Sequence, residues 1–180
     1  MKNFISIILF NILISNSPTY LNAQSIIKWS KETKLDWSDF KAPPNTDIIE
    51  YAQTSYKIEI VPSDVLVDQN NNIQNYQSLS VVANFYPNHS WVFKKDNYLL
   101  KHEQLHFDIA GLYALKMTVE FDKLKRNKIA DFDSYMDIYK KLWAECRNIQ
   151  KRYDKETNHG LLADINNKWI EEITTQINNI

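Results

Sequence analysis

The spacing of the apolar residues changes near Asp96, and this change constrains the fold more than any other feature. Before it, the run 54–61 alternates Tyr56, Ile58 and Ile60 with polar side chains. A period of two residues is typical of a half-buried strand. Two further runs, 78–86 and 90–93, are also predicted as strands. The Asn-rich run 68–77 between the first two predicts a hairpin loop.

After Asp96 the apolar residues recur at helical spacing, and three helices are predicted. They cover about 97–121, 132–153 and 162–177. Asp96 is expected to cap the first helix, and Asp133 or Ser134 the second. Strands followed by helices predict an α+β fold.

Length and composition bound the class of protein. The chain has 180 residues, of which 44% are hydrophobic, enough for one domain with its own core. The net charge of −1 does not favour a nucleic acid or an anionic membrane as partner. The single cysteine, Cys146, can form neither an internal disulfide nor a Cys-rich zinc site.

The first 23 residues are expected to be a secretory signal peptide. Lys2 precedes an apolar run from Phe4 to Ile14, and Leu21-Asn22-Ala23 resembles a cleavage site. The run is too short to span a bilayer comfortably, so no stable membrane insertion is expected after cleavage. A single domain over residues 24–180, exported to the periplasm or beyond the cell, is therefore predicted; a membrane anchor is the alternative.

The predicted helix 97–121 carries the pattern H-E-x-x-H at His102, Glu103 and His106. Two histidines one helical turn apart face the same side and can bind one Zn²⁺. The glutamate between them can reach a metal-bound water and act as general base. An ordinary polar helix face would show the same residues, but apolar residues on both flanks favour a buried helix. Buried polar side chains need partners, and a metal would supply one.

The pattern leaves the third ligand open. Gly111 and the residue at 112 do not fit the extended pattern of the metzincins. His159 lies in a polar break just before Gly160, where a tight turn can direct it at the site. Asp108 fits better as a residue that orients a ligand.

Four more acidic or histidine residues bear on the third ligand. Glu120 lies nearly three turns beyond His106 on the same predicted helix, too far to reach the metal. Glu171 or Glu172, on the last predicted helix, would complete a His-His-Glu site. His89 is expected in a surface turn.

The chain resembles a family of predicted secreted bacterial Zn-dependent proteases, zincin-like and catalogued as a domain of unknown function. The resemblance rests on "SWVFKKDNYLLKHEQLHFDIAGLYA", on "YDKETNHG", and on "KLDWSDFKAPP" near the N-terminus. It implies His102 and His106 as zinc ligands, Glu103 as the base and His159 as the third ligand. The family often has glycine where this chain has Leu105.

The sequence thus predicts a zincin-like zinc metallopeptidase, a hydrolase that acts on a peptide or protein substrate. Asp108 is expected to orient a ligand. Tyr153 is a candidate donor to the oxyanion, with a core tyrosine as the alternative. The strand 78–86 is expected at a sheet edge, where an extended substrate could pair with it. The rivals are an exported envelope or binding protein with a structural zinc site, and a zinc amidase acting on peptidoglycan peptides.

Overall fold

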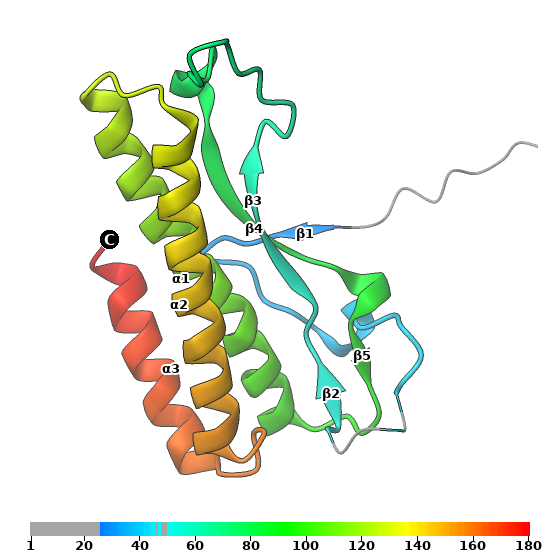
Figure 1. The fold of residues 1–180 in the computed structure, drawn as a ribbon. Coiled ribbons are helices and arrows are strands. Elements are labelled where there is room, and N and C mark those ends of the chain that lie inside the picture. Colours follow the sequence, from blue (N-terminus) through cyan, green and yellow to red (C-terminus); the bar gives the residue numbers. More distant parts are fainter. Residues whose placement is uncertain (1–25, 46, 48–49) are drawn as a thin grey trace, which may run out of the picture.

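The computed structural model describes residues 26–45, 47 and 50–180. The expected signal peptide and its cleavage point lie outside the described residues. The fold is α+β, as predicted, with small antiparallel sheets followed by three helices (Figure 1). Within the described part of the chain, none of the helices is both long enough and apolar enough to span a membrane.

The strands form two small antiparallel sheets. One has three strands in the order β1-β4-β3, and the other pairs β2 with β5. Their bounds are β1 Ile27–Lys28, β2 Ala52–Gln53, β3 Tyr56–Val61, β4 Ser80–Phe85 and β5 Trp91–Val92. Short 3-10 turns lie at Trp37–Asp39, Tyr76–Ser78 and Pro87–His89. Both longer predicted strands are thus confirmed, with ends trimmed by one or two residues.

The predicted edge position of the run 78–86 is wrong. This run forms β4, which pairs with β3 along its whole length and with β1 through Asn84 and Phe85. β4 therefore lies in the middle of the sheet and offers no free edge at its C-terminal end. The strand β1 is too short to be predicted from its own two residues, and it is β1 that covers this edge.

The three helices follow the predicted positions closely. They are α1 Asn97–Arg126, α2 Phe132–Thr157 and α3 Ala163–Asn178. Asp96 caps α1 as expected, because its side chain accepts the Tyr98 and Leu99 N–H groups. The predicted caps Asp133 and Ser134 are wrong for α2. Asp131 caps it instead, accepting from the Ser134 N–H at 2.8 Å.

Helix α1 lies at the centre of the molecule. It contacts β3 and β4 on one side and both α2 and α3 on another (Figure 1). Its middle is buried on nearly every side, with Phe107, Ile109, Leu112 and Met117 fully enclosed. The apolar flanks of the H-E-x-x-H pattern therefore do bury the helix, as predicted, and its polar residues lie inside the protein.

Candidate metal centre

The two histidines of the pattern face one another across one turn of α1. Their Nε2 atoms lie 3.1 Å apart, and their rings are nearly perpendicular, with centroids 4.6 Å apart. His102 is only 2% exposed. The helical register thus brings both imidazoles to one point, as the spacing predicts.

Asp154 on α2 completes the group, although no sequence pattern singles it out. Its Oδ1 lies 3.2 Å from the Nε2 of His102 and 2.9 Å from the Nε2 of His106. These three atoms form the cluster, among the described residues, that could hold a metal ion. The sequence predicts a helix that ends at Tyr153 and a polar break at Asp154. The helix in fact continues to Thr157, which fixes Asp154 one turn beyond Gln150 on the side that faces α1.

The spacing of the three atoms fits zinc. Zinc bound at its usual distances of about 2.0–2.1 Å with tetrahedral geometry holds neighbouring ligand atoms roughly 3.3 Å apart. The separations of 2.9, 3.1 and 3.2 Å are within a few tenths of an ångström of that value. Two nitrogens and one carboxylate oxygen are also a donor set that zinc accepts.

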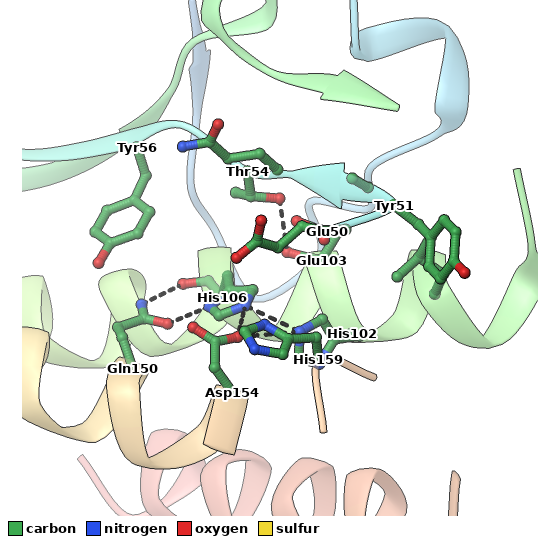
Figure 2. Close-up of a pocket in the computed structure, with 13 residues that line it drawn as sticks. Glu50, Tyr51, Thr54, Tyr56, His102, Glu103, His106, Gln150, Asp154 and His159 are labelled. Carbon is green, nitrogen blue, oxygen red and sulfur yellow. Dashed lines mark hydrogen bonds and ion pairs between the residues drawn. The ribbon is translucent and has the colours of Figure 1, made fainter. Parts of the chain in front are cut away.

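Glu103 lies beside this cluster with one oxygen free. It is 3% exposed, and its Oε2 is a buried atom without a hydrogen-bond partner. Burial raises the pKa of this carboxyl group. The Thr54 hydroxyl donates to the Glu103 backbone carbonyl at 3.2 Å and ties this turn of α1 to the segment above it (Figure 2). A buried carboxyl group with a free oxygen is suited to exchange a proton with a bound water.

The charge of the cluster is divided unequally. Burial lowers the pKa of His102 to about 4. Burial acts in the same direction on His106, but hydrogen bonding and charge from Asp154 outweigh it and raise the pKa of His106 to about 9. Burial would raise the pKa of Asp154, but its two histidine partners lower it well below the ordinary range. A neutral His102 therefore lies beside a His106–Asp154 ion pair, where a divalent cation could replace the proton.

Gln150 holds His106 in place. Its side-chain oxygen contacts the Nδ1 of His106, and its Nε2 donates to the His106 carbonyl at 2.8 Å. The Gln150 oxygen accepts from the Nδ1 N–H of His106, and the Nε2 of His106 therefore faces Asp154 and His102. Orientation of a metal-binding histidine through its second nitrogen is common in zinc sites. Gln150, like Asp154, carries no local sequence signal that predicts its role.

Tyr153 packs against the site but has no free hydroxyl hydrogen for an oxyanion. It is fully buried, and its ring stacks on His102 with centroids 4.5 Å apart. Its hydroxyl contacts the Asn166 side chain and the His102 carbonyl, the latter at 3.3 Å. These contacts are those of a core tyrosine, and Tyr153 positions His102.

Asp108 lies away from the cluster. Its Oδ1 accepts from Trp29 Nε1 at 2.9 Å and from Gln104 Nε2 at 3.0 Å. The predicted orienting role has no contact to support it, because these hydrogen bonds join Asp108 to the N-terminal segment and to its own helix. Burial raises the pKa of this carboxyl group.

His159 lines the same pocket as the cluster, although its nitrogens are not among the three converging atoms. It lies in a turn where three successive residues have positive φ: 49° at Asn158, 54° at His159 and 82° at Gly160. A Cβ on Gly160 would lie 2.9 Å from the Cβ of His102, so this turn is packed directly against the candidate ligand. His159 is exposed and can approach a bound substrate.

The remaining residues considered as ligands lie elsewhere. Glu120 pairs with Lys123 near the end of α1. Glu171 and Glu172 are on the exposed face of α3. His89 lies in an exposed turn, as expected, beside Tyr86.

A pocket of about 250 Å³ opens in front of the cluster. Its roof is the segment 50–54 with Tyr56, and its floor is formed by α1 and α2 (Figure 2). Glu103 and His159 both line it, so a molecule in the pocket would meet the cluster, the carboxyl group and the imidazole together.

Comparisons of the chain with protein-family models, with curated proteins and with solved structures found no match. The resemblance to secreted zinc-dependent proteases therefore stays an expectation from the sequence motifs.

Proposed function

We propose that the protein is a zinc-dependent metallopeptidase in which His102, His106 and Asp154 bind the metal. The observation that carries this proposal is the convergence of two Nε2 atoms and one Oδ1 atom at 2.9–3.2 Å. The ligand set differs from the one the resemblance implies, because Asp154 takes the place of His159. With three protein ligands, a fourth position is left for water, as in catalytic zinc sites.

Glu103 is the general base of the proposed reaction. Zinc, when bound here, would supply a water of lowered pKa and polarise the carbonyl that is attacked. The free Oε2 of Glu103 would take a proton from the attacking water and return it to the leaving amine when the C–N bond breaks. In this proposal His159, which lines the same pocket, donates a hydrogen bond to the substrate oxygen that gains charge.

The roof of the pocket favours an extended peptide as substrate. The Tyr51 carbonyl accepts from the Phe93 N–H at 2.7 Å. Since hydrogen-bonding groups alternate in direction along a strand, those of Ala52 are directed away from β5. Ala52 also lines the pocket, so an extended chain could pair with this edge. The strand proposed to pair with the substrate is therefore β2, and not β4 as the sequence predicts.

Metal analysis of the wild type and a set of variants tests the proposal. Wild type and His159→Ala are expected to bind one zinc per chain, Asp154→Ala to lose it, and Glu103→Gln to keep zinc while losing casein hydrolysis. His89→Ala, which removes an exposed histidine that does not line the pocket, is the matched control. If zinc-treated wild type holds no metal, or if His159→Ala rather than Asp154→Ala loses it, the proposed ligand set is wrong.

The rival functions predict different results on the same samples. A structural zinc site is closed by four protein ligands, so zinc would be retained and Glu103→Gln would change nothing. The free oxygen of Glu103 and the pocket in front of the cluster favour catalysis. Hydrolysis of peptidoglycan stem peptides but not casein would identify the amidase. Export is part of the proposal, and mature protein beginning at Gln24 would support it.

A further inference from the structure

A second cavity adjoins the pocket of the candidate metal centre. It has a volume of about 260 Å³. Tyr51 and Leu99 line both cavities, so the two share a wall. Gly160, which is packed against His102, also lines the second cavity. The second cavity therefore begins directly beside a candidate zinc ligand.

The wall of this second cavity is apolar and unusually exposed. Tyr51, Tyr98 and Leu161 line it, and they are 42%, 54% and 61% exposed. Large apolar side chains that gather at one exposed place mark a binding surface. The volume is below the roughly 300–1,000 Å³ of pockets for whole small molecules, and it suits a single large side chain.

The charged residues at the rim do not favour a charged occupant. Asp96 is engaged as the cap of α1, where it accepts from the Tyr98 and Leu99 N–H groups. Lys94 extends over the ring of Tyr51, with Nζ 5.9 Å from its centroid. One charge of each sign is thus present, and the surface between them is apolar.

We propose that this cavity is a specificity subsite that takes a large apolar side chain, such as Phe or Leu, of an extended peptide. The inference rests on the proposed peptidase function. Because a strand advances about 3.3 Å per residue, the side chain that enters belongs to a residue next to the cleaved bond or one further along. The substrate class is therefore peptides with a large apolar residue at that position.

Leu161 is the residue to test, and its neighbour supplies a matched control. Leu162 is also exposed, at 47%, but does not line the cavity. Zinc-loaded wild type, Leu161→Ser, Leu161→Lys and Leu162→Ser are given Ala/Ser peptides with a single Phe, Ala or Glu scanned through them. Cleavage positions are read by mass spectrometry.

Wild type is expected to prefer Phe over Ala at one position by about tenfold or more in kcat/KM. Leu161→Ser should remove most of that preference at that position alone, and Leu161→Lys should raise the relative rate with Glu there. Leu162→Ser should match wild type. A Phe preference that survives Leu161→Ser, or that falls equally in Leu162→Ser, overturns the subsite.

A binding measurement separates failure of the subsite from failure of the proposed function. Zinc-loaded Glu103→Gln is irradiated with the same peptides carrying benzoylphenylalanine in place of Phe, and the adducts are mapped. Adducts at Tyr98 or Leu161 support the subsite even if no sample cuts any peptide, in which case the peptidase proposal alone fails. Adducts scattered elsewhere overturn the subsite even if the protein is an active peptidase.

Discussion

At the scale of single residues, Gly160 is the position where the smallest change should disturb the candidate metal centre. Its φ of 82° lies in the left-handed region, and an added Cβ would lie 2.9 Å from the Cβ and Cγ of His102. Gly160→Ala should therefore displace His102 and also cost about 1–2 kcal/mol of backbone strain. We expect zinc affinity, measured by chelator competition, to fall at least tenfold.

Asn158→Gly is the control for Gly160→Ala. Asn158 also has a positive φ, of 49°, so glycine there relieves strain in the same turn without adding an atom near His102. Zinc affinity should stay within about twofold of wild type, since Asn158 is absent from the pocket that holds the cluster. Equal losses in the two variants would mean that the turn, and not its contact with His102, controls the site.

The His106–Asp154 pair should make the stability of the metal-free chain depend on pH. The pKa of His106 is raised from 6.5 to about 9, so folding favours its protonated form. Its contribution is fully present below about pH 6.5 and is lost as the pH rises through 9. In EDTA, the free energy of unfolding from urea titrations should fall over that range.

The comparison with His106→Gln isolates this effect. That variant should lack the alkaline loss, and His89→Gln, which changes an exposed turn, should retain it. A wild-type curve that rises between pH 6.5 and 9, or that His106→Gln leaves unaltered, would contradict the assigned ion pair.

The sequence allows the prediction of those site residues whose relation is local. His102, Glu103 and His106 lie within two turns of one helix, so helical periodicity alone places them together. Asp154 comes from another helix, 48 positions after His106 in the numbering, and its approach depends on how α2 packs against α1. The family resemblance implies His159 as the third ligand. In the structure His159 lines the pocket, but its nitrogens lie outside the group of three converging atoms.

At the scale of elements, periodicity predicts the three helices to within a few residues. The pairing of the strands and the contacts of the connecting segments are harder to predict from sequence. The edge position predicted for β4 is wrong because the two-residue β1 that covers it has no period of its own. The run 68–77 is more than a hairpin loop. Ile73 is 3% exposed, and its N–H donates to the Ala130 carbonyl at 2.7 Å, which joins this run to the link between α1 and α2.

The contact between the N-terminal segment and α1 gives a prediction at this scale. A Cβ on Gly111 would lie 2.1 Å from the ring of Trp29, and Trp29 also donates to Asp108. Gly111→Ala should therefore overpack this contact and lower the free energy of unfolding by about 1–3 kcal/mol. Urea denaturation measures the loss, and zinc affinity should be little changed because Trp29 and Gly111 do not line the metal pocket.

A double variant shows whether the tryptophan ring is the cause. In a Trp29→Ala background, Gly111→Ala should cost much less, so the two changes should not be additive. Additive losses would locate the effect in the helix itself, where alanine is in fact favoured over glycine, and the packing argument would be wrong.

At the scale of the whole molecule, the candidate metal centre joins parts that are distant in sequence. The two histidines lie on the central helix α1, and Asp154 lies near the end of α2, one turn before the link to α3. Tyr153 extends this connection, because it contacts His102 on α1 and Asn166 on α3. A metal bound here would therefore join α1 to α2 next to the pocket, and Tyr153 would extend that connection to α3.

If the cluster binds zinc as proposed, removal of the metal should lower the stability of the folded chain. Zinc at about 100 times its Kd stabilises the folded state by about 2.7 kcal/mol, which corresponds to roughly 5–10 °C in Tm for a domain of this size. We expect EDTA to lower the Tm of wild type by this amount in a scanning fluorimetry experiment. Hydrogen exchange should increase most in residues 150–166, which would connect a metal bound by Asp154 to α3.

Asp154→Ala is the decisive variant because it removes one proposed ligand. For each variant, the Tm is measured with and without EDTA, and the difference between the two values is compared. That difference in Tm should vanish in Asp154→Ala and persist in His89→Ala and in Glu103→Gln, since glutamine at 103 leaves all three ligands in place. A zinc-dependent shift that survives Asp154→Ala would show that the metal stabilises the chain through other ligands. In that case α2 would not be joined to α1 through the metal, and the exchange in residues 150–166 should not respond to EDTA.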